Sequence, residues 1–442
     1  MNKLISKFLF FALAIAAFTF TSCGDDDTAE PETCATLGCP DGFTCENDVC
    51  VQIVTDCNTT PCPDGFVCEN GTCVSATVRV TSNITADATW TANKTYILAT
   101  RVAVVNGVTL TIEPGTVIKG EAGQGPNATA LLVARGGKIN ACGTADLPII
   151  FTSIADNITG ADVAAGNLES PNLNPDVNGL WGGVLLLGKA KISVAGDAVE
   201  AQIEGIPTSD PNGLYGGTDD ADNSGTLCYV SIRHGGTNIG DGNEINGLTL
   251  GGVGSGTSIN HIEIVANQDD GVEWFGGTVS VSNLVVWNNG DDAVDTDQAW
   301  AGTLDNFVVV GPANSCLELD GPEGTYAAGH KIQNGYVIAN TGSEVTLNEF
   351  LIDVDGGATA TIVDLKNIYV TGIIDNSNTI AGPPSQVPTT TWTNIVLDIP
   401  AGDNLADYID EGVVPAGVTA TGASTADLTV FGWTWTKRAG AF

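Results

Sequence analysis

The sequence is poor in three kinds of residue: basic residues, aromatic residues and methionine. It contains only 15 Lys and Arg against 52 Asp and Glu, which gives a formal net charge of -37. A chain this acidic repels phosphate backbones and anionic lipid headgroups, so we exclude nucleic acid as a partner. Aromatic residues make up 6 % of the chain and there is one Met, which favours a thin, repetitive β architecture over a bulky globular core.

Long apolar runs are also missing beyond the first 20 residues, so we expect no transmembrane helix in the body of the chain. The apolar run at 8–20 follows Lys3 and Lys7, which is typical of a secretory signal peptide. Small residues and then Cys23 come next. This arrangement resembles a bacterial lipobox, in which the Cys is acylated and becomes the mature N-terminus. We therefore assign residues 1–22 as a lipoprotein signal peptide and Cys23 as the lipidation site.

Residues 23–33 are an acidic tether that contains Asp25, Asp26 and Asp27. An acidic run directly behind a lipidated Cys resembles the surface-export signal of Bacteroidota lipoproteins, although a solvated spacer would have the same composition. We therefore predict an outer-membrane protein that contacts the membrane through its N-terminal lipid and is exposed at the cell surface.

Eight of the twelve cysteines are concentrated in residues 34–75, where the spacing C-x4-C-x5-C-x4-C occurs twice. Each copy is too short to bury a core, and an exported chain meets an oxidising environment, so disulfides are expected. The predicted disulfide cysteines are Cys34, Cys39, Cys45, Cys50, Cys57, Cys62, Cys68 and Cys73. Four Cys permit three pairings, of which we favour first to third and second to fourth within each copy. The two copies resemble small EGF-like or Dickkopf-like modules.

From residue 76 onward, short β-type runs end at Gly, Asn or Asp. Runs that begin at Ile262, Leu284 and Phe307 match one another at intervals of 22 and 23 residues. A period of this length, built from β runs instead of helices, is typical of a solenoid. Longer stretches near 156–178 and 207–224 interrupt the period, and we expect them to project from the stack.

The segments GVTLTIEPGTVIKG, LLVARGGKINACGTADLPIIFTS and WGGVLLLGKA resemble a family of Bacteroidota surface lipoproteins with a right-handed parallel β-helix of the pectin-lyase-like type. The resemblance covers roughly residues 80–442, and it implies a fold and a location but no reaction. The predicted fold class is therefore all-β: a right-handed parallel β-helix over 76–442 behind a small disulfide-rich module. We expect the aromatic C-terminal segment to cap the last coil.

Three further cysteines, Cys142, Cys228 and Cys316, fall in separate coils of the predicted β-helix. Buried thiols are the default expectation for such positions. A bond between Cys142 and Cys228 is the alternative, and the sequence does not decide between the two.

The stretch NNGDDAVDTDQAW carries four aspartates in eight residues. The repeat aligns Glu273 and Glu318 with Asp295, so carboxylates would stack at the strand spacing of ~4.8 Å and repel one another. Calcium binds six to eight oxygen ligands of this kind. The candidate calcium ligands are Glu273, Asp291, Asp292, Asp295, Asp297, Glu318 and Asp320. The alternative is that these residues only form turns, which Asp and Asn favour.

An enzymatic interpretation rests on NGDDAV, which resembles the Gly-Asp-Asp tract of polygalacturonases. That family also has Gly-His-Gly and Arg-x-Lys segments. Here Gly329 and His330 are followed by Lys331, and no Arg occurs between Arg233 and Arg438. We therefore assign no catalytic residue and no organic cofactor.

The leading functional hypothesis is a surface lipoprotein whose β-helix binds a glycan or another macromolecule, such as a surface protein. A β-helical polysaccharide hydrolase or lyase is one alternative, and a structural envelope component is another. Trp300 follows a polar turn, so it is a candidate for stacking on a sugar if it is exposed, although core packing is the competing interpretation.

Overall fold

The computed structural model describes residues 57–442 apart from 64, 124, 239–243, 343–346 and 356–360, and before residue 57 it describes Cys39, β1 (Phe43–Glu46) and β2 (Val49–Gln52). The predicted signal peptide, Cys23 and the acidic tether lie outside the described residues. By internal contacts the chain divides into two units, one containing residues 1–63 and 68–73 and the other containing 64–67 and 74–442. No helix among the described residues has the length and apolar composition needed to cross a membrane.

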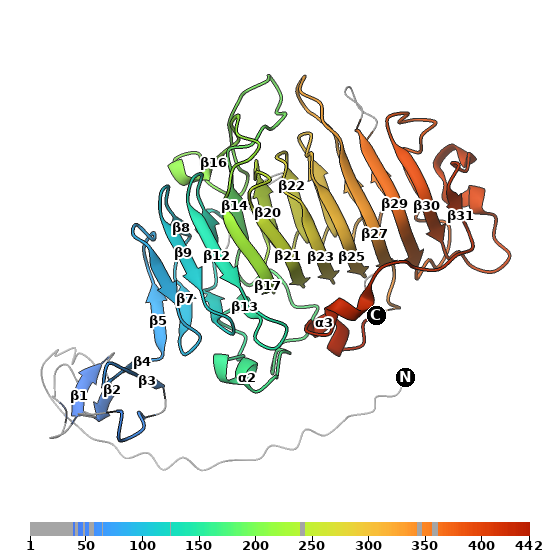
Figure 1. Ribbon diagram of the computed structural model, residues 1–442. Helices are drawn as coiled ribbons and strands as arrows, with labels where there is room; N and C mark the ends of the chain where they lie inside the picture. The colour runs from blue at the N-terminus through green and yellow to red at the C-terminus, as the bar shows by residue number, and fades with distance from the viewer. Residues whose placement is uncertain are drawn as a thin grey trace, which may run out of the picture. The chain divides into compact units, whose positions relative to one another are not determined.

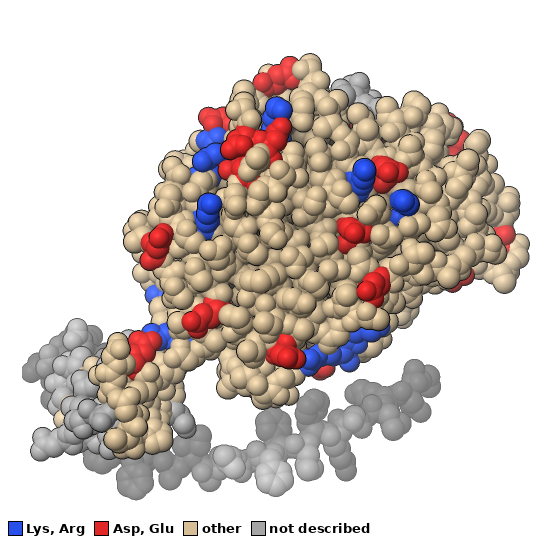
Figure 2. All heavy atoms as spheres, in the orientation of Figure 1, with Lys and Arg blue, Asp and Glu red and all other residues tan. Residues whose placement is uncertain are grey.

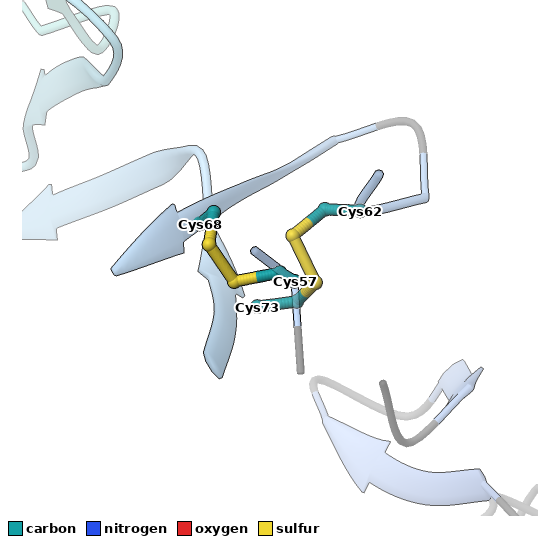
Figure 3. The surroundings of a disulfide bond; sticks show 4 residues. All are labelled: Cys57, Cys62, Cys68 and Cys73. Carbon is teal, nitrogen blue, oxygen red and sulfur yellow. A yellow bond between two sulfur atoms is a disulfide. The ribbon is translucent and has the colours of Figure 1, made fainter. Parts of the chain in front are cut away.

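The cysteine-rich repeats contain disulfides, as predicted. In the second copy Cys57 is bonded to Cys68 and Cys62 to Cys73, which is the first-to-third and second-to-fourth pattern (Figure 3). In the first copy Cys39 and Cys45 are disulfide-bonded as well. Each copy has a two-stranded sheet, formed by β1 and β2 in the first copy and by β3 (Phe66–Glu69) and β4 (Thr72–Ser75) in the second.

The second unit is a parallel β-helix, which confirms the predicted fold (Figure 1). A short sheet of eight strands contains β8 (Val102–Val104), β11 (Leu131–Val133), β14 (Val184–Leu187), β20 (Leu248–Gly251), β22 (Val272–Phe275), β24 (Val294–Asp297), β26 (Glu318–Leu319) and β28 (Asp353–Val354). All of its pairings are parallel and join strands of successive coils.

A long sheet of fifteen strands supplies the other walls. Its early strands are β5 (Thr77–Val80), β6 (Ala88–Trp90), β7 (Thr95–Leu98), β9 (Thr109–Ile112), β10 (Val117–Gly120), β12 (Lys138–Cys142) and β13 (Ile149–Ser153). The later ones are β17 (Gly225–Arg233), β21 (Ser258–Val265), β23 (Val281–Trp287), β25 (Thr303–Val310), β27 (His330–Ile338), β29 (Val363–Thr371), β30 (Thr391–Leu397) and β31 (Val418–Thr419). Because β17 pairs with β12 along its first half and with β13 along its second, each long strand serves two walls.

A residue with positive φ lies in the middle of each long strand from β17 to β30 and bends it between the two walls. The residues are Tyr229, His261, Asn283, Asn306, Asn334, Asn367 and Asn394. Asparagine tolerates this left-handed conformation better than most residues do. The amides also form a ladder: Asn306 Nδ2 donates to Asn283 Oδ1 at 2.7 Å, and Asn394 Nδ2 donates to Asn367 Oδ1 at 3.0 Å.

The interior of the β-helix is a continuous apolar core made by alternate residues of every wall. The register predicted from the repeat is confirmed: Ile262 pairs with Leu284, and Leu284 pairs with Phe307. All three side chains are fully buried in that core. The repeat period thus places the same kind of side chain at the same depth in successive coils.

The inserted stretches lie outside the coils, in agreement with the prediction, and their apolar residues also cover parts of the outer faces of the walls. Residues Ile158, Val163 and Leu168, around α2 (Gly160–Ala164), pack on Val117 and Ile150 of the long sheet. Segment 192–215, which contains β15 (Ala201–Gln202), η2 (Pro211–Gly213) and β16 (Leu214–Tyr215), packs on the first strands of the short sheet.

The aromatic C-terminal segment differs from the prediction that it caps the last coil. It contains η5 (Leu428–Phe431) and α3 (Trp435–Arg438), and it lies against the outer face of the long sheet near β21, β23 and β25 (Figure 1). Phe431 and Trp435 pack on a stripe of apolar side chains that these strands turn outward, including Trp287. The stripe explains this position, because without the segment it would be exposed to water.

The remaining described elements are short. They are η1 (Gly125–Asn127), β18 (Thr237–Asn238), β19 (Glu244–Ile245), η3 (Leu405–Tyr408) and η4 (Asp410–Gly412). Cys142 of β12 is bonded to Cys228, its direct partner on β17. Cys316 is a buried free thiol.

Candidate acidic site

The outward-facing side chains of the short sheet change from apolar to acidic halfway along its length. Across successive strands one column of paired residues reads Ala103, Leu132, Leu185, Thr249, Glu273, Asp295, Glu318 and Asp353. The apolar members lie beneath the segment 192–215. Beyond that cover the same column presents four carboxylates in a row, and we call this part of the sheet the acidic face.

Two further columns widen the acidic face. Asp320 N donates to Thr296 O and Asp355 N donates to Leu319 O, which places Asp297, Asp320 and Asp355 at equivalent positions of successive coils. In the preceding turn, Asp292 N donates to Asp270 Oδ1 at 3.0 Å. The predicted alignment of Glu273 and Glu318 with Asp295 is therefore correct, and the turn aspartates stack beside it.

Two groups of three carboxyls are compact enough to share a cation. Oxygen atoms of Asp269, Asp270 and Asp291 lie within 4.8 Å of one another, and the same holds for Asp270, Glu273 and Asp295. Asp270 belongs to both groups. Since Asp270 and Glu273 are each only 7 % exposed, water screens their charges poorly.

The protonation of these carboxyls is shifted by burial and by their neighbours. Burial first, and then the carboxylates of Asp295 and Glu204, raise the pKa of Glu273 well above its usual range. Burial and nearby carboxylates likewise raise the pKa of Asp269 to about 8 and that of Asp291 to about 6. Burial is the leading cause at all three groups, and neighbouring carboxylates raise each pKa further.

One buried amide is directed into the same cluster. Asn246 is fully buried, and its Nδ2 donates to Glu273 Oε2 and, at 3.3 Å, to Glu204 Oε1. Its Oδ1 has no hydrogen-bond partner in the described part of the chain. A buried acceptor without a donor costs about 1–3 kcal/mol, so this oxygen is a further potential ligand for a cation.

The acidic face ends in a cleft of about 350 Å³ whose lining includes five carboxylates. They are Glu318, Asp320, Asp353, Asp355 and Asp410. Burial, and then the neighbouring carboxylate of Asp355, raise the pKa of Asp320 and that of Asp353 to about 6. The carboxylate array therefore extends from the buried groups at Asp270 to an open depression.

The structure brings all seven predicted calcium ligands onto this face and adds residues that were not selected. Asp270 and Asp353 could have been found, because NQDDGVEW aligns with NNGDDAVDTD and LIDVDG aligns with LELDG. Glu204 and Asn246 could not, because the repeat pattern does not extend to them and only the folded chain brings them beside Glu273.

The prediction that Trp300 could be exposed and stack on a sugar is wrong. Trp300 has no exposed surface, its Nε1 donates to Val279 O at 2.8 Å, and its ring stacks on Trp274 with centroids 4.7 Å apart. The polar turn suggested an exposed side chain. However, Gln298 and Ala299 both adopt positive φ, and the chain thereby turns Trp300 into the interior.

The fold and this face together define the class: a parallel β-helix protein with carboxylates on one outer wall. The chain belongs to the family of the pectate-lyase like beta helix domain, which matches residues 82–381. A pectin methylesterase from Aspergillus niger, solved in a penultimately deglycosylated form, is 14 % identical; the similarity covers 77 % of this chain and 88 % of that enzyme, with a TM-score of 0.28. We draw no functional conclusion from that likeness. No curated protein sequence matches this chain.

Proposed function

We propose that the acidic face binds divalent cations of the calcium type on a β-helix that a lipid on Cys23 holds at the cell surface, where the protein binds glycan. The cation proposal rests on one observation: Asp270 belongs to both compact groups of three carboxyls. Two unit charges ~4 Å apart repel by about 1 kcal/mol in water and by about 4 kcal/mol at an effective dielectric constant of about 20. Either protons or cations must relieve that repulsion.

Calcium suits the available ligands better than other common metals do. The cluster offers carboxylate oxygens and one amide oxygen, and no described His or Cys belongs to either compact group. Hard oxygen ligands in an irregular arrangement favour Ca²⁺, whereas zinc favours nitrogen and sulfur, and magnesium demands near-octahedral geometry. Glu273, Asp270 and Asp295 are the residues that we expect to hold the ion.

Thermal unfolding of the full chain in the presence of Ca²⁺ tests this proposal. An ion that binds only the folded state stabilises it by about 2.7 kcal/mol at a concentration of a hundred times its dissociation constant. Millimolar CaCl₂ should raise Tm more than NaCl of matched ionic strength does. The double variant Asp270→Asn, Asp295→Asn should lose this difference, and its metal-free Tm should equal or exceed that of the native protein because repulsion is relieved.

A matched control is Asp146→Asn, which removes an exposed carboxylate elsewhere on the β-helix. This variant should keep the full response to Ca²⁺. Equal shifts of Tm in CaCl₂ and NaCl would mean that salt only screens the carboxylates, and the cation proposal would then be abandoned in favour of residues that merely form turns.

The surface location is supported by the signal peptide, the lipobox-like Cys23 and the acidic run behind it. Labelled fatty acid should enter the native protein and not the Cys23→Ser variant, which should leave the membrane fraction. Protease added to intact cells should cleave the native protein, and replacing Asp25, Asp26 and Asp27 with Ser should reduce that cleavage. A protein that stays unlabelled and membrane-bound in both forms would contradict the lipid anchor.

Polysaccharide cleavage is the second candidate, and one observation favours it. Asp269 and Asp291 have oxygens within 4.8 Å, and their pKa values are about 8 and about 6. Glycosidases use such a pair, one carboxyl protonated and the other ionised. Release of reducing ends from neutral polysaccharides, lost in Asp269→Asn, would establish this activity; a native protein that binds glycan without cleaving it would exclude it.

A further inference from the structure

A second cleft, of quite different chemistry, lies on the outer surface of the long sheet. Its volume is about 450 Å³, and it spans β21 and β23. The lining consists of Ser, Thr, Asn and Gly residues with Ile259 and His261, and it contains no carboxylate, Lys or Arg. We propose that this cleft binds a neutral glycan. The inference rests on the glycan-binding function proposed above and gives that function a site.

The cleft lies in the part of the sheet whose outward columns are uncharged, and both columns become charged only toward the C-terminal coils. One outward column of the long sheet contains Thr226 and Ser258 on β17 and β21, and it becomes charged at Lys331 of β27 and Asp364 of β29. The next column is neutral at Asn260 and Ser282, which pair directly, and becomes charged at Asp305. Figure 2 shows the same property: the surface over β21 and β23 is largely free of acidic and basic side chains.

Exposed hydroxyls recur along the cleft at the spacing of the coils, and that of Ser280 accepts a hydrogen bond from Thr303 N at 3.2 Å. Ser258 and Ser280 are exposed one coil apart, so their hydroxyls are separated by about the strand spacing of ~4.8 Å. That spacing is comparable to the length of one sugar ring. Within the described residues the hydroxyls of Ser258 and Ser282 make no hydrogen bond, and each can both donate to and accept from a sugar hydroxyl.

An uncharged ring forms one wall of the cleft. His261 Nδ1 lies 2.7 Å from Asn260 Oδ1, and His261 Nε2 lies 3.3 Å from Asn283 Nδ2. An amide oxygen only accepts and an amide nitrogen only donates, so Nδ1 carries the proton and the imidazole is neutral. The ring stacks on Tyr229 with centroids 4.2 Å apart, and burial lowers the pKa of His261.

These features fit a glycan better than a peptide or an acidic polymer. β21 and β23 have parallel partners on both sides, so they offer no free edge to which a peptide strand could add. The cleft has no basic side chain that could pair with a uronate. The His261 ring offers a face for stacking, and the hydroxyl and amide groups beside it offer donors and acceptors for an uncharged polar ligand.

Calorimetric titration of the full chain with neutral hexasaccharides of glucose, xylose and mannose tests the proposal, with hexagalacturonate as the charged probe. We expect at least one neutral hexasaccharide to bind and hexagalacturonate not to bind at this cleft. The double variant Ser258→Glu, Ser280→Glu introduces charge and bulk at two exposed positions and should weaken neutral binding at least tenfold. The control Thr391→Glu, Thr393→Glu places the same charges on the same sheet at β30 and should bind as the native protein does.

The acidic-face variant Asp270→Asn, Asp295→Asn separates this inference from the cation proposal. Neutral binding that survives in this variant and is lost in the Ser258, Ser280 variant supports the cleft, whatever the response to Ca²⁺ is. Neutral binding lost only in the acidic-face variant would move the glycan to that face and overturn the cleft. Native affinity in the Ser258, Ser280 variant, or no binding of any neutral probe, would overturn it as well.

Discussion

Glu273 and Asp295 are directly paired residues of neighbouring parallel strands, and their side chains leave the sheet on the same side. Neighbouring strands are ~4.8 Å apart, so the two carboxyls cannot move away from each other without disrupting the sheet. Oxygen atoms of the two carboxyls lie within 4.8 Å of each other, so a proton on one of them relieves their repulsion. The stability of the β-helix is therefore linked to pH and to any cation that replaces that proton.

The metal-free protein should lose stability as pH rises. The folded-state pKa is raised to about 6 for Asp291 and Asp320, and to about 8 for Asp269 and Asp297. An unfolded chain releases these protons near pH 4, so the folded state holds more protons between pH 4 and 8. The stabilisation is complete below pH 4 and disappears as pH passes the folded values.

Thermal melts in EDTA, taken at intervals from pH 4.5 to 8.5, check this prediction. Tm should fall steadily over the range, and millimolar Ca²⁺ should reduce or remove the fall because it neutralises the same groups. The variant Asp270→Asn, Asp295→Asn should show a shallower decline than the native protein. A Tm that rises with pH in EDTA would show that the acidic face is already neutralised by other means.

Trp300 should act on stability and not on ligand binding. Replacing it with Ala removes a fully buried ring that stacks on Trp274, and such changes cost about 3–5 kcal/mol. Trp300→Phe keeps a ring but removes the Nε1 donor to Val279 O, so it should cost about 1–3 kcal/mol. Urea unfolding gives both values. A folded Trp300→Phe protein with weakened glycan affinity and unchanged stability would contradict this assignment.

The fold could be predicted because its cause is local and repeated. Alternation within each run and a period of 22 to 23 residues place Ile262, Leu284 and Phe307 inside the coils, and the same period aligns Glu273 with Asp295. The asparagine ladder was also present in the sequence, since Asn283, Asn306 and three later residues precede matching runs, but its role becomes clear only once the bend between the walls is known.

Other features depended on contacts between distant parts of the chain. Glu204 joins the acidic face from an inserted segment whose position is set by its apolar contacts with Leu185 and its neighbours. The C-terminal aromatics alternate as a strand does, yet they form a short helix because the apolar stripe around Trp287 and the carboxylate of Glu263 stabilise that arrangement. Neither contact can be inferred from the sequence repeat.

Glu263 should be essential for holding the C-terminal segment. Its Oε1 accepts hydrogen bonds from Thr436 N and Thr436 Oγ1, each at 2.8 Å, and its Oε2 lies 3.5 Å from the buried Arg233 guanidinium. Glu263→Ala leaves that guanidinium buried without its carboxylate, which costs about 3–5 kcal/mol. The segment should then become sensitive to protease.

Limited proteolysis and urea unfolding measure the two effects of Glu263→Ala. The double variant Glu263→Leu, Arg233→Met removes both charges, so it should be more stable than Glu263→Ala even though it is altered at two sites. Thr436→Val, which loses one of the two hydrogen bonds from Thr436, should have a smaller effect than Glu263→Ala. A double variant less stable than Glu263→Ala would mean that the ion pair itself stabilises the packing of Trp435.

Three kinds of cysteine should be distinguishable in the folded protein. Peptide mapping without reduction should recover Cys142 linked to Cys228, and it should find no link between the two cysteine-rich copies. The Cys142–Cys228 bond joins neighbouring strands that are 86 residues apart in sequence, and closing a loop of that length restricts the unfolded chain by an estimated ~4–5 kcal/mol. Replacing both residues with Ala should therefore lower stability by about 2–4 kcal/mol, with little change in the folded sheet.

Cys316 has no exposed surface, so iodoacetamide should modify it only after unfolding. Rapid labelling of Cys316 in the folded protein, or a free thiol at Cys142, would show that these coils are packed differently.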